Sequence, residues 1–346
     1  MYRKKLEIPL HFQAEKVNKI WKVDYQQRAK EAMEWSKKYK LHPASEDKVK
    51  VALLLVDVQN TFCIPGFELF VGGRSGKGAV EDSVRLCKFV YRNLDVITKI
   101  FPTMDTHQPI QIFHSLFLIN DEGNHPEPYT LISYEDIEKG KWKINLDAVK
   151  YLGFDEKEAG QYLIHYTKTL KEKSKYDLTI WPYHAMLGGI GHALVSSVEE
   201  AIFFHSTARY SQPGIQIKGR NPLTEHYSVF GPEVRTDFKG YQISGKNFSL
   251  LDTLSSYDVI IVAGQAKSHC VAWSVEDMLE YFSSKNKELI KRVYLLEDAT
   301  SPVVVPGVID YTEDADKAFK KFSDAGVHIA KTSDPIEEWE GVNLGE

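Results

Sequence analysis

The sequence is poor in cysteine, has no long apolar run and shows no large excess of one charge. Only three of its 346 residues are cysteine, so any disulfide scheme leaves one unpaired, and their spacing matches no metal-binding pattern. No apolar run approaches the length of a membrane span. Residues 1–9 are charged and lack the apolar centre of a secretory leader. These absences predict a protein of a reducing compartment, the cytoplasm, with no membrane partner.

The charge balance also excludes a class of partner. The chain carries 43 basic and 48 acidic side chains, a formal net charge of −5, and the two signs are interspersed. This pattern does not predict a basic patch of the kind that binds nucleic acid. With 43% hydrophobic and 12% aromatic residues, the chain can form one large α/β domain with additions, or two small domains.

Short apolar runs alternate with helical patterns along most of the chain. This alternation predicts an α/β fold with a mostly parallel, doubly wound sheet and helices on both of its faces. The predicted strands are 51–58, 96–104, 110–117, 215–218, 259–263, 293–296 and 327–330, and the main predicted helices are 23–39, 80–94, 156–171 and 312–325.

Two segments fall outside this alternation. Residues 1–48 are rich in lysine, tryptophan and tyrosine, and we interpret them as an N-terminal arm that packs on the core or on a neighbouring subunit. Residues 49–346 then form one domain, with a polar insertion at about 119–178 that has helical stretches and contains no repeat. We interpret this insertion as a subdomain or lid.

The segment that ends in Cys270 is the most informative stretch of the sequence. The strand 259–263 is broken by Gly264, and a helical pattern follows Cys270. At the start of a helix the free N–H groups and the positive end of the helix dipole favour a thiolate over a thiol. The spacing therefore predicts a reactive cysteine, with a buried structural cysteine as the alternative.

Two charged residues occupy equivalent positions in other strands. Asp57 interrupts the otherwise apolar run 51–58, and Lys218 ends the short strand before Gly219. The carboxyl ends of parallel strands lie along one edge of a sheet, where ligand sites form, so Asp57, Lys218 and Cys270 can converge. A thiolate stabilised by an ammonium, with a carboxylate that can take and return a proton, can catalyse acyl transfer.

A second group has the composition of a metal site. Asp105 and His107 are two positions apart at the end of a predicted strand, so both side chains can face one ligand. His184 returns much later in the chain, in the sequence Trp-Pro-Tyr-His. Three protein ligands with an open position are the usual form of a catalytic zinc site, so these residues are candidate ligands of a divalent metal.

Several of these pieces, in this order, resemble the nicotinamidase/isochorismatase-like cysteine hydrolases, and most closely their nicotinamidase branch. The matching pieces are LLLVDVQNTFCIPGFELFVGG, MDTH, WPYH, IKGRNPLTEHYSVF, IIVAGQAKSHCVAWSVEDM and LLEDATSP. The resemblance implies a three-layer α/β sandwich and a catalytic triad of Asp57, Lys218 and Cys270. It also implies a divalent metal, zinc, bound by Asp105, His107 and His184.

The resemblance carries further expectations for the site. A cis peptide is expected between Gln265 and Ala266, with the backbone N–H groups of Ala266 and Cys270 forming the oxyanion hole. Phe62, Thr106 and His269 are expected to line the substrate pocket. The implied reaction converts a small-molecule amide to an acid and ammonia through a thioester on Cys270, in a protein that is a homo-oligomer.

The sequence departs from the family pattern at several positions. Thr106 and His269 stand where nicotinamidases usually have tryptophan and tyrosine, and Thr61 stands where the family favours an acid. The identity of the amide therefore stays open. One alternative is a hydrolase of an N-carbamoyl or ureido compound, for which Arg209 or Arg220 would bind a substrate carboxylate. Another is a catalytically inactive binding protein.

Overall fold

A six-stranded parallel sheet forms the centre of the computed structural model, which describes residues 6–344. The order across the sheet is β12-β9-β8-β1-β2-β7, and every neighbouring pair is parallel. The strands are β1 (Val51–Val56), β2 (Lys99–Asp105), β7 (Gln216–Lys218), β8 (Val259–Gly264), β9 (Val293–Leu296) and β12 (His328–Ala330). The strands predicted at these places are confirmed.

The two central strands are apolar because both of their faces are covered. All residues of β1 and β8 are buried, as is typical of strands inside an α/β sheet. Gly264, opposite Val56 in the register, has a φ of +118°, and a Cβ there would lie 2.0 Å from the Val56 carbonyl oxygen. Only glycine therefore allows β8 to end so close to β1, immediately before the segment that contains Cys270.

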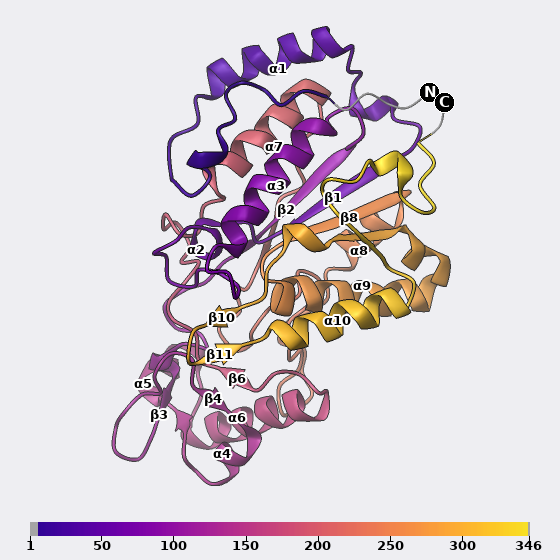
Figure 1. Ribbon diagram of the computed structural model, residues 1–346. Coiled ribbons are helices and arrows are strands. Elements are labelled where there is room, and N and C mark those ends of the chain that lie inside the picture. The colour runs from indigo at the N-terminus through magenta and orange to yellow at the C-terminus, as the bar shows by residue number, and fades with distance from the viewer. Residues whose placement is uncertain (1–5, 345–346) are drawn as a thin grey trace.

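Helices cover both faces of the sheet (Figure 1). On one side lie α3 (Gly78–Arg92) and α7 (Ser196–Arg209), and on the other lie α8 (Phe248–Ser255), α9 (Ala272–Lys285) and α10 (Thr312–Asp324). This arrangement is a three-layer α/β sandwich, so the fold class predicted from the sequence is confirmed.

The N-terminal arm packs on the first helical layer. Its helix α1 (Tyr25–Tyr39) lies along the outer side of α7 (Figure 1). Arg28 of α1 contacts Glu200 of α7 at 3.1 Å, and the His11 ring donates to or accepts from the Tyr91 hydroxyl of α3 at 3.0 Å. The arm therefore covers its own chain, from the Tyr91 end of α3 to the start of α7, where the Trp21 N–H donates to the Ser196 hydroxyl at 3.0 Å.

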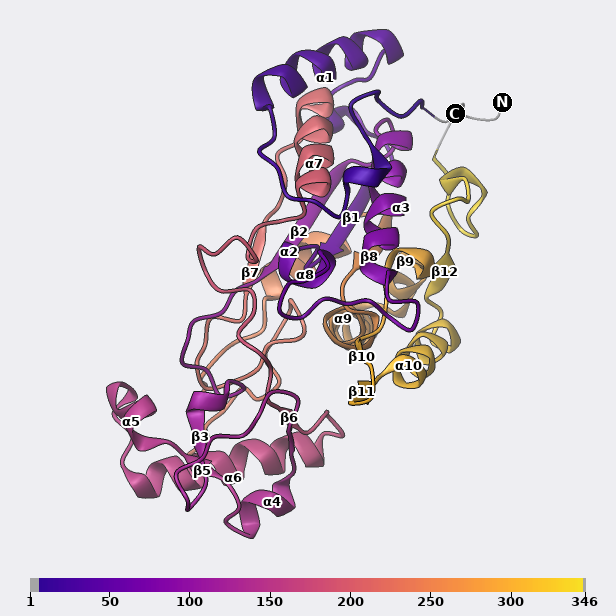
Figure 2. The ribbon, with the colours of Figure 1, turned by 60° about the vertical axis from the view of Figure 1, so that its left-hand side comes forward.

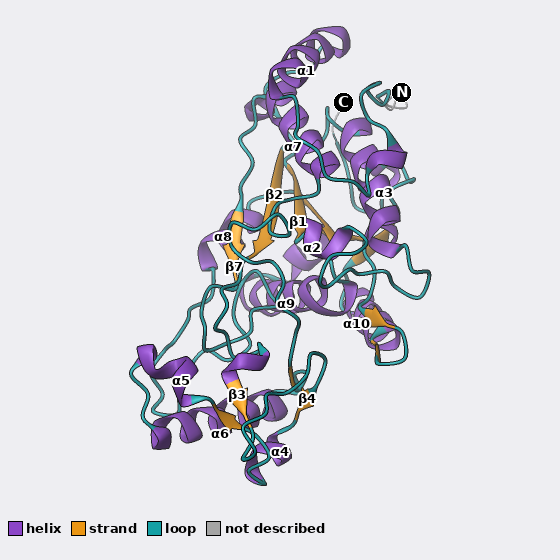
Figure 3. Ribbon diagram, turned by 90° about the vertical axis from the view of Figure 1, so that its left-hand side faces the viewer, coloured by secondary structure: helices purple, strands orange, loops and turns teal. Residues whose placement is uncertain are grey.

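Residues 118–179 form a separate lobe beside the sheet (Figures 2 and 3). Its elements are β3 (Leu118–Ile119), β4 (Leu131–Ile132), α4 (Tyr134–Glu138), β5 (Lys143–Ile144), α5 (Leu146–Val149), α6 (Glu156–Glu172) and β6 (Leu178–Thr179). β3 pairs with β5 and β4 with β6, both antiparallel. We refer to this segment as the lobe.

The two chain segments that connect the lobe to the sheet are joined by backbone hydrogen bonds. The His107 N–H donates to the Ala185 carbonyl at 3.0 Å, and the Leu187 N–H donates to the His107 carbonyl at 3.0 Å. The chain therefore leaves the sheet after β2 and comes back to nearly the same point.

One predicted strand is wrong. The apolar run 110–117 forms turns and a short 3-10 helix (Ser115–Phe117) instead of a strand. Ile112, Phe113 and Phe117 are nevertheless fully buried. Burial of a short apolar run does not require a strand, because periodicity alone cannot separate a strand from a buried turn.

The remaining elements are short. They are α2 (Asn60–Cys63), which follows β1, and the hairpin of β10 (Val304–Val305) and β11 (Ile309–Asp310). Among the described residues, no helix has both the length and the apolar character needed to cross a lipid bilayer.

Candidate active site

The ends of four adjacent strands bring the predicted catalytic residues together. Across the sheet, Cys270 follows β8, Asp57 follows β1, Asp105 ends β2 and Lys218 ends β7. The register places Asp105 directly opposite Lys218. The convergence of Asp57, Lys218 and Cys270, expected from the strand-end rule, is therefore present in the structure.

Lys218 lies at the centre of this group. Its Nζ is 3.0 Å from Asp57 Oδ2, 2.9 Å from Asp105 Oδ1 and 3.6 Å from Cys270 Sγ. It also donates to the His226 carbonyl at 2.8 Å. Burial disfavours the ammonium, but Asp105 and Asp57 outweigh this effect and raise the pKa of Lys218 well above its usual value. The side chain is thus a permanent buried cation between two carboxylates.

Asp57 is fixed by the neighbouring strand. Thr103 of β2 donates its hydroxyl to Asp57 Oδ1 at 2.5 Å and accepts from the Asp57 N–H at 3.0 Å. The residue has a φ of +46°, a conformation that aspartate tolerates better than most residues. Burial raises the pKa of Asp57, partly offset by Lys218, so this carboxylate binds a proton more readily than an exposed one.

Cys270 lies next to this carboxylate. The turn Lys267–Val271 carries the cysteine and leads into α9, as the spacing predicts, and Asp57 is one of the groups that raise the pKa of its thiol. Burial raises the pKa of Cys270, and the opposing effect of Lys218 does not overcome it. The expected resting thiolate is therefore not favoured. A helix terminus stabilises charge only weakly compared with full desolvation, so Asp57 must remove the proton during attack.

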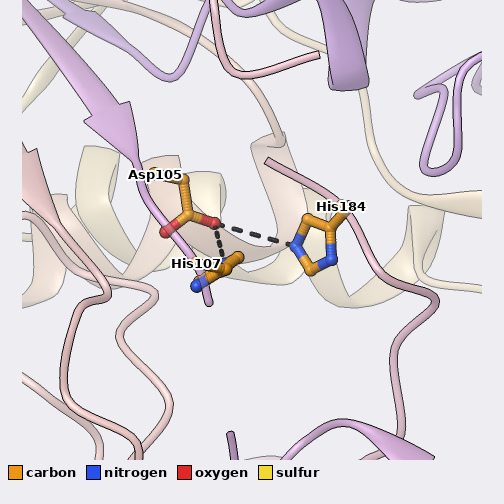
Figure 4. A group of neighbouring side chains, drawn as sticks. All are labelled: Asp105, His107 and His184. Carbon is orange, nitrogen blue, oxygen red and sulfur yellow. Dashed lines mark hydrogen bonds and ion pairs between the residues drawn. The ribbon is translucent and has the colours of Figure 1, made fainter. Parts of the chain in front are cut away.

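Asp105, His107 and His184 form the compact group that the sequence predicts (Figure 4). Their candidate ligand atoms all lie within 4.8 Å of one another, and all three side chains are buried. Asp105 Oδ2 is 2.8 Å from His107 Nε2 and 3.8 Å from His184 Nε2. Figure 4 shows both imidazoles on the same side of the carboxylate, with one oxygen facing both rings.

Backbone carbonyls orient both imidazoles for metal binding. His184 Nδ1 donates to the Pro182 carbonyl at 2.8 Å, and His107 Nδ1 donates to the Gly219 carbonyl at 3.2 Å. Each Nε2 is then directed at Asp105, which is the orientation that metal-ligating histidines usually have. Gly219 is required here, because a Cβ would lie 2.7 Å from Asp105 Oδ1. The residues present therefore fit a divalent metal.

The ionisation of Asp105 and His184 agrees with this fit, whereas Asp105 outweighs burial and raises the pKa of His107. Burial opposes the charge on Asp105, but His107 and Lys218 outweigh it and hold the pKa of Asp105 well below its usual range. Burial, together with the charge of His107, lowers the pKa of His184 to about 3. A carboxylate and a neutral imidazole are the forms in which these side chains bind a metal ion.

A small pocket opens over Cys270, with a free volume of about 30 Å³. Phe62, His269, Ala266 and Cys270 line it, as the resemblance implies. Thr106 does not. Successive side chains of an extended segment point to opposite faces, so Thr106 faces away from Asp105, and its hydroxyl contacts the Met104 carbonyl and His192 instead.

Other lining residues were not identified from the sequence. They are Leu69, Val71, Trp181, Glu225, Tyr227 and Val303. Trp181 and Tyr227 lie within pieces that carry the resemblance, and the Trp181 indole N–H donates to the Tyr227 hydroxyl at 3.0 Å. Glu225 lies in the same piece of the sequence as Tyr227, which is the signal that could have indicated it. Burial raises the pKa of Glu225 to about 7.

Neither arginine considered for a substrate carboxylate lines the pocket. Arg209 is buried at the opposite end of the sheet, where it donates to the carbonyls of His42 and Leu94 and pairs with Asp47. Arg220 is exposed. The described lining contains the carboxyl groups of Asp105 and Glu225 but no arginine or lysine. No arginine or lysine of the described lining can therefore pair with a substrate carboxylate.

The segment before Cys270 is held by a buried polar cluster. The peptide bond between Gln265 and Ala266 is cis, as the resemblance implies. The Gln265 side chain donates to Asp82 Oδ2 at 2.9 Å and accepts from the Ser301 N–H at 3.2 Å, while the Ser301 hydroxyl donates to the same Asp82 oxygen at 2.6 Å. These contacts fix the backbone that leads to Ala266.

Comparison with known proteins agrees with the architecture. No protein-family model matches the chain, and no curated protein sequence matches it. Among solved structures, similar ones include nicotinamidases. The yeast nicotinamidase Pnc1p shares 17% identity over 81% of this chain and 99% of its own, with a TM-score of 0.50.

Two further structures give similar values. Yeast Pnc1p bound to the inhibitor nicotinaldehyde shares 16% identity over 81% of this chain and 99% of its own, at a TM-score of 0.50. An Acinetobacter baumanii nicotinamidase/pyrazinamidase shares 17% identity over 82% of this chain and 97% of its own, at 0.47. At such identities the likeness shows a shared fold. The chain thus has the α/β fold of the yeast enzyme, which the resemblance in its sequence implies.

Proposed function

We propose that the protein is a cysteine amidase that cleaves the C–N bond of a small neutral amide to give an acid and ammonia. The observation that carries the proposal is the contact of Lys218 Nζ with both Asp57 and Cys270, the last of which lines a small pocket. A thiol, a carboxylate able to take its proton and a fixed cation are the groups that thioester chemistry needs.

The first half-reaction follows from these positions. Asp57 takes the thiol proton as Cys270 Sγ bonds to the amide carbonyl carbon, and the carbonyl oxygen becomes an oxyanion. The backbone N–H groups of Ala266 and Cys270 are proposed to donate to it, an interaction worth on the order of 10²–10³ in rate per donor. When the C–N bond breaks, Asp57 returns the proton to the leaving nitrogen, and ammonia departs from a thioester.

Hydrolysis uses the same groups in reverse order. Asp57 accepts a proton from the water that adds to the thioester carbonyl. Collapse of this second tetrahedral species breaks the C–S bond, and Cys270 regains its proton as the acid leaves. Lys218 keeps one positive charge beside Asp57 and Cys270 throughout the reaction. The negative charge can therefore move between the two side chains and stay paired with a cation in the buried, low-dielectric site.

Asp105, His107 and His184 are proposed to hold a divalent metal, with zinc as the proposed ion because the ligand set is one carboxylate and two imidazoles. When bound, the ion supplies a fixed positive charge and Lewis acidity at the edge of the pocket, which Asp105 and His184 both line.

The pocket limits the substrate to a small, uncharged molecule. Its walls are mostly aromatic and aliphatic, and no arginine or lysine is among the lining residues. A flat aromatic amide fits such walls better than a carboxylate-bearing ureide, so we propose nicotinamide as the first substrate to test.

The test is ammonia release from nicotinamide by the purified, metal-loaded protein. We expect turnover with stoichiometric formation of nicotinate. If nicotinamide, pyrazinamide and benzamide all give no ammonia, and Cys270 reacts with iodoacetamide no faster than Cys63 or Cys87, the amidase proposal fails and the inactive binding protein becomes the better interpretation.

The metal site gives a separate prediction. His184→Ala should weaken zinc binding by at least about 100-fold, because loss of a ligand costs more than the 10–100-fold typical of losing an outer-shell partner. Competition with a chromogenic chelator measures the affinity. His192→Ala is the matched control, since His192 contacts Thr106 and is not one of the three ligands. Equal zinc affinity in wild type and His184→Ala would place the ion elsewhere.

A further inference from the structure

The helix α6 of the lobe packs against a part of the site that has no regular structure. The buried residues of the helix recur every three or four positions, which gives it one buried face. They are Ala159, Tyr162, Leu163, Tyr166, Thr167 and Leu170. Tyr162 and Tyr166 are fully buried, and their hydroxyls contact the backbone of residues 223–225, a segment without helix or strand. The lobe therefore contacts the core at a segment that follows Lys218 in the chain.

The two tyrosine hydroxyls hold the backbone of this segment. The Tyr162 hydroxyl donates to the Leu223 carbonyl at 2.6 Å. The Glu225 N–H donates to the Tyr166 hydroxyl at 3.0 Å, and the Glu225 carbonyl accepts from the Glu233 N–H at 2.9 Å. Buried backbone groups outside helices and strands need partners of this kind. The lobe thus supplies part of the hydrogen bonding that keeps the segment in one conformation.

The next residue, His226, connects this segment to Lys218. Its carbonyl accepts from Lys218 Nζ at 2.8 Å, and its Nδ1 accepts from the Gly219 N–H at 3.1 Å. The His226 N–H donates to Glu225 Oε1 at 2.8 Å. Lys218 Nζ therefore has a neutral partner in addition to two carboxylates and a thiol. This partner lies one residue away from the contact with Tyr166.

The same segment forms part of the pocket wall. Glu225 and Tyr227 line the pocket over Cys270. No residue of the lobe belongs to the described lining. The lobe acts on the site through the residues that it holds in place, not through a side chain of its own.

Two further contacts fasten the lobe beside this segment. Lys175 Nζ lies 2.9 Å from Glu233 Oε2 and 3.7 Å from the centre of the Trp273 ring in α9. The Tyr176 hydroxyl donates to the Ser268 carbonyl at 3.0 Å, in the turn before α9. A hinged lid would break all of these contacts each time it opened, so they favour a fixed position of the lobe.

We propose that the lobe is a fixed support of the active site rather than a lid, and that Tyr166 is a positioning residue that keeps the His226 carbonyl at Lys218. The inference rests on the proposed amidase function, in which Lys218 balances the charge of Asp57 and Cys270. Through Tyr166, the lobe influences the position of a cation that belongs to the sheet.

The physical reason is the flexibility of the lysine side chain. Its ammonium is a point charge on a flexible stem, so a neutral acceptor on one side helps to determine where it lies between two carboxylates. Without the Tyr166 hydroxyl, the buried Glu225 N–H loses its acceptor, and the segment shifts to recover a partner. The His226 carbonyl shifts with it. Small displacements of a catalytic group lower the rate steeply.

The first test is Tyr166→Phe, which keeps the ring and removes the hydroxyl. We expect kcat for nicotinamide to fall by on the order of tenfold, with KM changed by less than about threefold, because misplacement of Lys218 affects the reaction more than binding. Tyr162→Phe removes the neighbouring contact and should give a smaller effect of the same kind. It also keeps the inference testable if Tyr166→Phe does not fold.

Tyr294→Phe is the matched control. Tyr294 is 2% exposed, and its hydroxyl also contacts the backbone, donating to the Glu340 carbonyl at 2.6 Å, but it does not line the pocket. This variant should lose a similar amount of Tm and keep the wild-type kcat. Wild-type kcat in both Tyr166→Phe and Tyr162→Phe would overturn the inference, as would an equal loss of kcat in Tyr294→Phe.

A double-mutant cycle shows whether Tyr166 acts through Lys218. In the Lys218→Met background, Tyr166→Phe should lower kcat by less than about a further twofold, because the cation that it positions is absent. A purely structural role would give the same factor in both backgrounds. Full additivity would therefore overturn the inference.

Alkylation of Cys270 by iodoacetamide, followed by mass spectrometry, separates this inference from the proposed function. The rate depends on the Lys218 charge beside the sulfur and requires no turnover. A severalfold lower rate in Tyr166→Phe, with no further decrease when Lys218→Met is present, supports the inference even if no amide is hydrolysed, in which case only the amidase proposal fails. Amide hydrolysis with wild-type kcat and wild-type alkylation in Tyr166→Phe overturns the inference and leaves the amidase intact.

Discussion

Replacement of Cys270 by alanine is expected to lower kcat/KM for the amide by on the order of 10⁴–10⁶, because loss of a catalytic nucleophile removes the covalent pathway itself. The pocket and Asp57 remain, so the residual rate comes from binding and from any water that adds directly. The substitution removes the 3.6 Å contact between Cys270 and Lys218, but Lys218 stays paired with Asp57 and Asp105. We therefore expect the variant to retain its fold.

The measurement is ammonia release, together with mass spectrometry of the wild type quenched during turnover. A mass increase equal to the acyl group should map to the peptide that contains Cys270. Cys87→Ala is the matched control, because Cys87 is a buried residue of α3 whose pKa is raised by burial and which contributes no group to the pocket. A Cys270→Ala variant with more than a tenth of wild-type activity would exclude the thioester mechanism.

Lys218→Met should damage both activity and stability. Removing the ammonium leaves the buried carboxylates of Asp57 and Asp105 without their common partner, and an uncompensated buried charge typically costs about 3–5 kcal/mol of folding free energy. Asp57 then binds a proton at rest and can no longer act as the base, so we expect kcat to fall by about 10²–10⁴.

Lys246→Met is the matched control for this variant. Lys246 also has a nearly buried side chain and also lies between two carboxylates, at 3.1 Å from Asp277 and 2.5 Å from Glu280, but these are not the carboxylates of the candidate site. It should lose stability without losing activity. Urea unfolding and steady-state kinetics measure the two effects. Wild-type kcat in Lys218→Met would show that the cation is only structural.

The stability deficit of Lys218→Met should depend on pH. Without the cation, burial raises the pKa of Asp57 further above its unfolded value. A carboxyl whose folded pKa is raised destabilises the fold when ionised, so the deficit is full above the raised pKa and shrinks as the pH falls toward the ordinary value near 4. A deficit independent of pH would mean that packing of the Lys218 stem, not charge, is what the substitution removes.

The sheet and the reactive group could be predicted because their signals are local. β1 and β8 are uninterrupted apolar runs, a pattern typical of strands covered on both faces. The chain places each of three residues at the end of a strand or shortly after one: Asp57, Lys218 and Cys270. The carboxyl ends of parallel strands lie along the same edge of the sheet. The order of the strands then determines their convergence, and the resemblance supplied the roles.

The pocket walls could not be predicted in the same way. The resemblance implies a pocket position for Thr106, but alternation along an extended segment turns its side chain away. Arg209 has the right chemistry at the wrong end of the sheet. Such outcomes depend on direction and on tertiary placement, which residue type does not encode.

Contacts between residues far apart in the chain could not be predicted from the sequence either. Tyr176 contacts Ser268 across 92 positions of the chain, and no spacing rule connects them. Thr61, which stands where an acid was expected, donates its hydroxyl to Glu68 Oε2 at 3.0 Å, so a carboxylate reaches this position from elsewhere. Compensation of this kind becomes visible only when the chain is folded.

The hydrogen bonds that join the two ends of the lobe have an evolutionary consequence. His107 pairs with the backbone of Ala185 and Leu187. The chain between these residues, which includes the lobe, is therefore a loop whose two ends are fixed next to each other on the core. The entropic cost of closing a loop rises only slowly with its length, so this loop can become longer or shorter, or be replaced, with little loss of stability in the sheet. Selection can therefore revise which molecules the protein accepts while the groups that break the bond stay unchanged.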